Sequence, residues 1–404
     1  MTSAPAGILV VTVDRLPAWI LPAYGATWVA MPGLDALAGR GLVLDRLIAC
    51  GDDPRRAASD LVGDTGQGLL AAAAAGGWPV TVVTDDESLL PEGLAARATV
   101  RHLAASVKAD VEDDEEATNL ARLFAVAAEV VKTGGQRLVW CHAGSLGVAW
   151  DAPGEFREAY VDPDDPAPPA GAGVPAVDID ADTDPDLVVG IRQAFAGQLT
   201  LLDHCLGRLL DALPADGDVG WTVVVAGLRG LPLGLHRRVG TAPLAPYGEL
   251  VHVPAIIADA HGRMAAQRYG GLSLHADLGV TLVELVSGVP GAVDPSRPMQ
   301  GRSLVGLLES WSALERDRVI VTGSAGVAVV TPAWQFVRAA PCGAGGPAPG
   351  RLFAKPDDYF EVCDVADRCP AVAEELQKIA EAVTAGDQER AWMEPLSAAA
   401  RGTT

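Results

Sequence analysis

The stretch Ile8-Leu-Val-Val-Thr-Val13, followed at once by Asp14-Arg15-Leu16, is the strongest strand signal near the N-terminus. An unbroken run of apolar and β-branched residues is typical of a strand that is buried on both faces, as in the parallel sheets of α/β proteins. Four further runs of this kind follow in the sequence: Val80–Thr84, Leu138–Cys141, Trp221–Ala226 and Val253–Ile257. We therefore expect these five segments to form one buried, mostly parallel sheet.

Helical patterns separate the predicted strands. They cover Arg55–Ala75, Glu115–Val131, Leu187–Leu213 and His275–Val286. This alternation predicts a sheet with helices on both faces. After about residue 300 the pattern changes to three short strands and a closing helix, at Val319–Thr322, Val327–Val330, Trp334–Val337 and Pro370–Ala385. We therefore expect an α/β domain over residues 1–300 and a small C-terminal α+β subdomain over residues 301–404.

The composition restricts the class of partner. The protein has 404 residues with 52 acidic and 30 basic side chains, a net charge of −22. Nucleic acids and anionic membranes are bound by clustered Lys and Arg, so this acidic protein is expected to bind neither. The N-terminus has no basic and apolar leader, and no run of residues is long and apolar enough for a membrane span, which favours a cytoplasmic location. The six cysteines lack zinc-type spacing and are expected to be reduced thiols.

Two short motifs resemble known sites but lack features that those sites require. The segment 178–184 resembles the start of a calcium loop, but Thr183 stands where the sharp turn needs Gly, and Val189 stands where a bidentate Glu is needed. The run Ala143-Gly-Ser-Leu-Gly147 imitates a nucleophile elbow around Ser145, but no clear helix follows it. Both are expected to be ordinary loops.

The informative residues follow the predicted strands, where open α/β sheets place their sites. The first strand leads into Asp14-Arg15, then Tyr24-Gly25 and the helix-like Met31-Pro-Gly-Leu-Asp-Ala-Leu-Ala38. A later strand leads into Gly227-Leu228-Arg229-Gly230. It is followed by Leu233-Gly-Leu-His236 and Glu249-Leu-Val-His-Val-Pro254.

This order and spacing resemble the sulfatases of the alkaline phosphatase superfamily. That family opens with a strand ending in Asp-Asp, then Tyr-Gly and a Thr-Pro-Asn-Leu-Asp-like helix, and later has Ser-Asp-His-Gly and Leu-Gly-x-His. Gln300-Gly-Arg-Ser-Leu304 and the tail from Arg351 to Pro370 also look like its closing segments, so the resemblance spans nearly the whole sequence. It implies an α/β fold with a mixed, mostly parallel sheet between helices and a small C-terminal α+β lobe. It also implies descent from a family of sulfuric ester hydrolases.

The resemblance implies that most residues at the positions of the family's metal ligands have been replaced. The family binds a divalent cation, usually calcium, with two N-terminal Asp and a later Asp-Asn or Asp-His pair. Here those slots hold Asp14, Arg15, Leu228 and Arg229, so only Asp14 remains as a metal remnant. Arg and Leu cannot donate oxygen to a hard cation, and two arginines are compatible with this position only without a dication. No cofactor is therefore expected.

The nucleophile slot has changed as well. The family nucleophile belongs to a C-x-P-x-R motif, and here Asp52-Asp53-Pro54-Arg55-Arg56 keeps Pro and Arg but places Asp52 in that slot. His236 matches the family His that assists at the leaving group, and His142 matches another active-site His. Asp52, Arg56, His236 and His142 are thus the candidate catalytic residues, and Arg15, Arg56 and Arg229 the candidate ligand-binding residues. We expect Asp14 and Asp52 to lie within salt-bridge reach of Arg15, Arg56 or Arg229.

Three hypotheses about function remain open. The first is a sulfatase-like pseudoenzyme that has lost metal and nucleophile and now binds a ligand or acts as a scaffold. The second is a sulfuric or phosphoric ester hydrolase of the same superfamily, with an altered mechanism that uses His236 as acid or base. The third is an unrelated α/β enzyme. The expected partners are a small oxyanion, a sulfate or phosphate ester, a protein partner or a second copy of this protein.

Overall fold

The computed structural model describes residues 5–63, 68–214, 220–241, 243–289, 301–310, 316–341 and 349–402. Its centre is a nine-stranded mixed sheet in the order β11-β2-β10-β7-β1-β5-β3-β4, with β9 paired to β2. The strands are β1 Gly7–Val13, β2 Leu42–Ile48, β3 Val80–Thr84, β4 Thr99–His102, β5 Leu138–Ala143, β7 Trp221–Gly227, β9 His252–Val253, β10 Ala255–Ala258 and β11 Gln267–Ser273. Strand β10 runs antiparallel to both of its neighbours, so β2 again runs in the direction of β7. The carboxyl ends of β2, β7, β1, β5 and β3 therefore lie at one edge.

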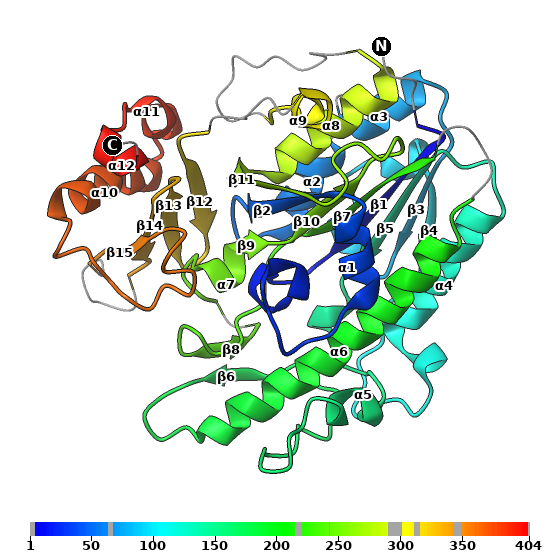
Figure 1. The fold of residues 1–404 in the computed structure, drawn as a ribbon, viewed down its shortest axis with the longest axis horizontal. Coiled ribbons are helices and arrows are strands. Elements are labelled where there is room, and N and C mark those ends of the chain that lie inside the picture. The colour runs from blue at the N-terminus through cyan, green and yellow to red at the C-terminus, as the bar shows by residue number, and fades with distance from the viewer. Residues whose placement is uncertain are drawn as a thin grey trace.

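Helices cover both faces of this sheet (Figure 1). One face is covered by α1 Pro32–Gly39, α4 Asn119–Lys132 and α6 Pro185–Asp211, and the other by α2 Pro54–Val62, α3 Leu69–Ala75, α8 His275–Ser287 and α9 Val305–Ser310. Strand β1 shows why both faces need a cover: Leu9, Val11 and Val13 enter the first core, and Ile8 and Val10 enter the second.

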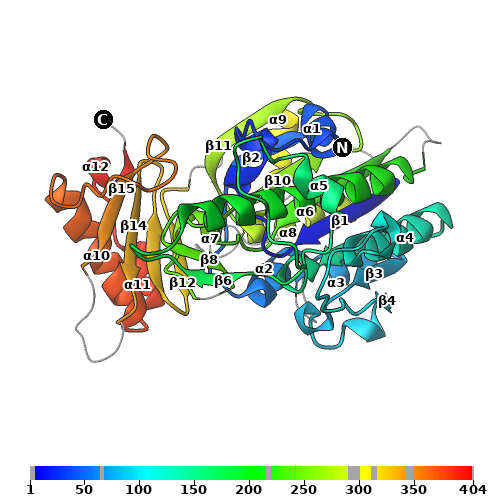
Figure 2. The ribbon, with the colours of Figure 1, turned by 90° about the horizontal axis from the view of Figure 1, so that it is seen from below.

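The C-terminal lobe lies at one end of the molecule, as Figure 2 shows. Its antiparallel sheet is formed by β12 Val319–Gly323, β13 Gly326–Val330, β14 Trp334–Ala339 and β15 Arg351–Ala354. One face packs on α10 Pro370–Thr384, α11 Gln388–Met393 and α12 Ala398–Arg401. The other face packs on the large domain through Tyr247, Leu250, Leu272 and Leu274. The boundary expected at residue 300 falls in 290–300, outside the described residues, and stays a proposal.

Smaller elements complete the described part of the fold. They are α5 Gly154–Glu158, α7 Gly248–Val251, the antiparallel pair β6 Ala176–Asp178 and β8 Arg238–Gly240, and six 3-10 helices among the described residues at Ala18–Ile20, Pro22–Tyr24, Glu87–Leu89, Leu94–Ala96, Glu115–Ala117 and Ser145–Gly147.

The expected fold class is confirmed, and three of the details in which the structure differs from the expectation have a clear physical reason. The predicted strand 253–257 is two strands, because Pro254 has no N–H for a sheet ladder, and both strands run antiparallel to their neighbours. The predicted helix 55–75 is interrupted after Val62, where Gly63 takes a left-handed φ of 81°. Strand β2 was not predicted, because the half-buried Asp45 and Arg46 interrupt its apolar run.

Within the described residues, no helix combines the length and the apolar character that a bilayer crossing requires.

Candidate functional site

The sheet brings the ends of three parallel strands together. In the register of the ladder, Val13 of β1 pairs with Gly227 of β7 on one side and with Ala143 of β5 on the other. The pairing continues one residue further, since Leu228 N–H donates to Val13 C=O and Asp14 N–H donates to Ala143 C=O, both at 2.9 Å. The residues that follow these strands therefore emerge side by side.

Arg229 donates hydrogen bonds to both carboxylate oxygens of Asp14. Its Nε lies 2.9 Å from Oδ1 and its Nη2 2.9 Å from Oδ2, a bidentate geometry. The remaining Nη1 donates to the backbone carbonyl oxygen of Asp52 at 2.8 Å. The two side chains are largely buried, with 8% of Asp14 and 19% of Arg229 exposed. One guanidinium thus joins the loops after β1 and β7 to the loop after β2.

Arg15 completes this arginine cluster, which we define as Asp14, Arg15 and Arg229. Its Nε lies 3.7 Å from Asp14 Oδ2. The backbone of Arg15 has a left-handed φ of 63°, which is unusual for a residue other than glycine. Gly147 makes room for the guanidinium, since a Cβ there would lie 2.3 Å from Arg15 Nε. Burial lowers the pKa of Arg15, the charge of Asp14 opposes this shift, and the charge of Arg229 adds to it.

The expected salt bridges hold for Asp14 but not for Asp52. Asp52 Oδ2 accepts hydrogen bonds from Ser324 N–H at 2.8 Å and Ser324 Oγ at 2.5 Å, in the turn between β12 and β13. Among the described residues its carboxylate makes no ion pair with an arginine, and only its backbone oxygen meets Arg229. The expectation for Asp52 is wrong because the C-terminal lobe, whose turn cannot be placed from sequence, supplies the partner.

Two neighbours of Asp52, Cys50 and Arg56, make no hydrogen bond or ion pair with the arginine cluster among the described residues. Arg56 is exposed on α2 and its Nε lies 4.0 Å from Asp60 Oδ2, four residues further along the same helix. Burial raises the pKa of the Cys50 thiol to about 12. A thiol with that pKa carries almost no thiolate at neutral pH and is a poor nucleophile.

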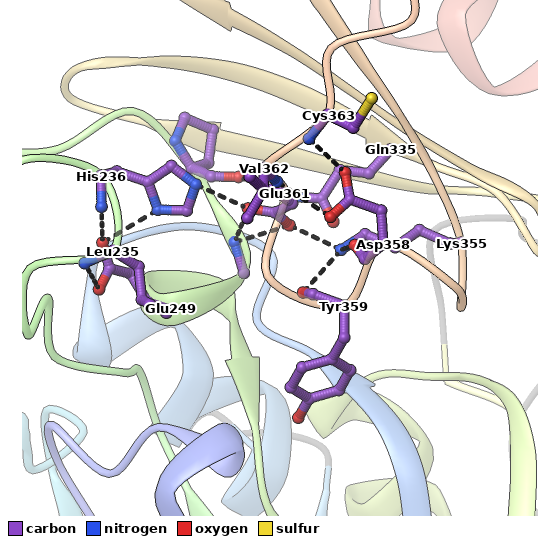
Figure 3. Close-up of polar contacts among 12 residues, drawn as sticks. Leu235, His236, Glu249, Gln335, Lys355, Asp358, Tyr359, Glu361, Val362 and Cys363 are labelled. Carbon is purple, nitrogen blue, oxygen red and sulfur yellow. Dashed lines mark hydrogen bonds and ion pairs between the residues drawn. The ribbon is translucent and has the colours of Figure 1, made fainter.

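His236 lies in a second group of charged residues, shown in Figure 3. Its Nδ1 lies 3.0 Å from Glu249 Oε1, and its Nε2 lies 3.4 Å from Glu361 Oε2. The imidazole stacks on Tyr247, with ring centroids 3.8 Å apart. Glu249 also accepts the backbone N–H groups of Leu233 and His236, both at 3.0 Å. The ring is therefore held by a hydrogen bond at Nδ1 and by stacking on one face, while Nε2 makes no hydrogen bond among the described residues.

Glu361 and Lys355 reach this group from the C-terminal lobe. Glu361 accepts the N–H of Gly248 on both oxygens, at 3.0 and 2.8 Å, and Lys355 Nζ lies 3.0 Å from Glu361 Oε1. Lys355 also donates to the backbone carbonyl oxygens of Asp358 and Tyr359. We call His236, Glu249, Lys355 and Glu361 the histidine cluster. Glu361 and Lys355 were not predicted, because they lie more than 100 residues from His236 and no motif marks them.

His142 lies inside the same edge of the sheet as Asp14. Its Nδ1 is 2.8 Å from Thr12 Oγ1, which also accepts a hydrogen bond from Trp140 Nε1 at 2.8 Å. Its Nε2 is buried and has no hydrogen-bond partner among the described residues. Burial lowers the pKa of His142, opposed by the charges of Asp85, Asp14 and Asp86. This ring is neutral and enclosed at neutral pH.

The predicted site residues thus fall into separate groups. The structure brings Asp14, Arg15 and Arg229 together, with the backbone of Asp52 attached. No hydrogen bond or ion pair within the described residues links His236 or Arg56 to that cluster. Leu228, which the resemblance predicted to stand in a metal slot, is fully buried in the core.

Comparison with known proteins gives a match at the level of structure. No protein-family model and no curated protein matches the sequence. The phosphonate monoester hydrolase of Agrobacterium radiobacter superposes with a TM-score of 0.71 at 18% identity, covering 95% of this protein and 96% of that one. BT4656, solved in complex with its substrate D-glucosamine-2-N,6-O-disulfate, has a TM-score of 0.73 at 14% identity over 98% of this protein and 100% of that one.

A third solved structure, BT1596, described as a 2-O GAG sulfatase, has a TM-score of 0.69 at 14% identity over 100% of this protein and 97% of that one. Identities this low establish the fold and leave the activity open. The protein therefore has the fold of the sulfatases and phosphonate monoester hydrolases of the alkaline phosphatase superfamily, along nearly its whole length.

Proposed function

We propose that this protein is a sulfatase-fold pseudoenzyme that does not hydrolyse esters by a metal-dependent route, and that it binds a ligand or acts as a scaffold. The bidentate pair between Arg229 and Asp14 is the observation that carries this proposal. The guanidinium places a positive charge at the strand ends and joins three loops, as a bound metal ion would. Unlike a metal ion, it has no open coordination position for a substrate.

The residues at this position do not fit a divalent cation. Hard cations take oxygen ligands, and both oxygens of Asp14 already accept hydrogen bonds from Arg229. Arg15 and Leu228 offer no side-chain oxygen. In the described ranges no group of three or more His, Cys, Asp or Glu residues is placed to hold a metal ion. We therefore derive no step through a metal.

The nucleophile slot supports the same proposal. The carboxylate of Asp52 is held by Ser324, and its charge would repel an anionic ester. Cys50 is kept protonated by burial. Nothing described near the arginine cluster is thus activated for attack on sulfur or phosphorus.

The alternative, an ester hydrolase with an altered mechanism, requires His236 to exchange protons with a substrate. Only 8% of its side chain is exposed, and both ring nitrogens face carboxylates. An oxyanion would also have to compete with Asp14 for Arg229. We therefore favour the pseudoenzyme, with a small oxyanion, a sulfate or phosphate ester, another protein or a second copy of itself as its proposed partner, and a cytoplasmic location.

Steady-state assays with 4-nitrophenyl sulfate and with a 4-nitrophenyl phosphonate monoester test this proposal, with and without added Ca²⁺ and Mg²⁺. We expect no turnover above that of the Asp52→Ala variant, and peptide mass spectrometry should show an unmodified Cys50. Turnover that is lost in Asp52→Ala, or formylglycine at Cys50, would contradict the proposal.

A further inference from the structure

A cavity of about 500 Å³ lies between the large sheet and the C-terminal lobe. Its walls come from β2, from β11, from the end of β13 and the start of β14, and from the loop at 355–359. Its volume falls in the range of small-molecule sites, and sites of this kind occur preferentially where two lobes meet. Figure 3 shows the ring of Tyr359, which lines this cavity, pointing away from the contacts of Glu361.

Arg46 gives the cavity wall a positive charge that no described carboxylate pairs with. The other charged groups of the wall are paired: Asp45 with Arg268 at 2.5 Å, and Lys355 with Glu361 at 3.0 Å. Arg46 makes no ion pair among the described residues. Its Nη1 and Nη2 donate to the backbone carbonyl oxygens of Pro332 and Thr331, at 2.7 and 2.8 Å.

Arg46 keeps its charge at neutral pH. Burial lowers its pKa to about 10, well above 7. The two backbone acceptors use two of the five donors of the guanidinium, so others remain for a ligand. A half-buried cation of this kind attracts anions strongly, because the surrounding protein screens it less than water does. This local excess of positive charge contrasts with the net charge of −22 for the whole protein.

The rest of the wall suits a flat apolar group. It includes the rings of Tyr24 and Tyr359 and the side chains of Ile48, Val330 and Pro332. Tyr24 is held in place because its hydroxyl hydrogen-bonds to the backbone of Leu44 and Ala255. His252 adds no charge, since burial lowers its pKa to about 4.

We propose that this cavity binds a small organic monoanion with a flat apolar body, held by Arg46 and packed between Tyr24 and Tyr359. The site uses none of the residues of the arginine cluster. It is therefore a binding site separate from the arginine cluster, and it does not depend on whether the protein hydrolyses esters.

Isothermal titration calorimetry with 1-naphthalenesulfonate tests the proposal, because this probe has one negative charge and no hydrolysable bond. The matched neutral probe is 1-naphthalenesulfonamide, and inorganic sulfate supplies charge without the apolar body. We expect saturable binding of the sulfonate at one site per protein molecule. The sulfonamide should bind at least about tenfold more weakly, as expected for the loss of a charge-assisted hydrogen bond.

Four variants locate the site. Arg46→Gln should weaken binding of the sulfonate by about tenfold or more, whereas Arg46→Lys, which keeps the charge, should weaken it less. Gly270→Leu should also weaken it, since Gly270 lines the cavity and a Cβ there meets no heavy atom within 4 Å. The exposed Arg97→Gln is the control for a general change of charge and should leave binding unchanged.

Equal affinity for the sulfonate and the sulfonamide would overturn the proposal, and so would undiminished binding in Gly270→Leu. If Arg46→Gln does not fold, Gly270→Leu and the pair of probes decide the question. Hydrolysis of aryl sulfates would overturn the proposed function without affecting this inference.

Discussion

The arginine cluster and the histidine cluster balance their charges in opposite ways. In the first, one carboxylate, Asp14, faces two guanidiniums. In the second, two carboxylates, Glu249 and Glu361, face the imidazole of His236 and the ammonium of Lys355. The arginine cluster joins loops within the large domain, whereas the histidine cluster joins that domain to the C-terminal lobe.

The two clusters therefore stabilise different parts of the fold. The strand-end cluster has an excess of cations, so it depends on its one carboxylate, Asp14. A lobe-junction cluster with several backbone donors, such as Gly248 N–H on Glu361, shares its charge over many hydrogen bonds. Removing one member should therefore cost more in the first cluster than in the second.

The largest effect is expected from Asp14→Asn. This substitution keeps the size of the side chain but leaves Arg229 and Arg15 as like charges without a counter-ion. Breaking a buried pair costs about 3–5 kcal/mol, so the free energy of unfolding in denaturant should fall by that amount. Arg56→Ala is the matched control, because exposed pairs contribute about 0–1 kcal/mol. Equal small losses in both variants would mean that the arginine cluster is solvated.

Acid should weaken the lobe junction through His252, whose ring packs on Tyr359. Burial, with Lys355 and Arg46 nearby, lowers the pKa of His252 from 6.5 in the unfolded state to about 4. The unfolded state therefore binds a proton before the folded state does, and stability is lost as the pH falls from 6.5 towards 4. This shift amounts to about 3 kcal/mol.

Denaturant unfolding at pH 7 and at pH 4.5 measures the acid effect, and the His252→Gln variant isolates the contribution of His252. The variant should lose less stability between the two pH values than the wild type does. An unchanged difference between the two pH values in the variant would assign the acid sensitivity to other groups, such as the buried His275, whose pKa is also lowered to about 4.

A smaller loss of stability is expected from Glu361→Gln in the histidine cluster. The amide keeps one acceptor for Gly248 N–H but removes the charge that faces Lys355. Lys355 keeps its hydrogen bonds to the backbone carbonyl oxygens of Asp358 and Tyr359, so it is not left without partners. Hydrogen bonds to charged groups contribute about 1.5–3 kcal/mol, so we expect a loss of stability in that range, below the loss in Asp14→Asn. Calorimetric unfolding of the two variants side by side checks the order. A reversed order would show that the lobe junction depends on one charge more than the strand ends do.

The smallest effect is expected from Gly147→Ala. The added Cβ would lie 2.3 Å from Arg15 Nε, so the flexible end of Arg15 must move while every charge is kept. We expect a loss of about 1 kcal/mol, at the low end of the cost of overpacking. Gly154→Ala is a control, since a Cβ there meets no heavy atom within 4 Å. Identical stability of the two variants would mean that Arg15 packs loosely.

The sequence predicts the arginine cluster better than the histidine cluster, and the reason is physical. Asp14, Arg15 and Arg229 directly follow buried strands whose parallel pairing is readable from their apolar runs, so their proximity follows from the sheet. Glu361, Lys355 and Ser324 come from the C-terminal lobe, whose packing on the large domain depends on side-chain fit at Tyr247 and Leu272 rather than on any local pattern. The same dependence explains why the partner of Asp52 was predicted wrongly.

The metal content of the purified protein decides whether Arg229 excludes a divalent cation from the strand ends. It is determined by elemental analysis after exposure to Ca²⁺ and Mg²⁺ and removal of free ions. If Arg229 occupies the position of the cation, the protein should retain far less than one Ca²⁺ or Mg²⁺ per molecule, and EDTA should leave its Tm unchanged, because a ligand that does not bind the native state cannot stabilise it. About one tightly held divalent ion per molecule, with a Tm that falls in EDTA, would contradict the account.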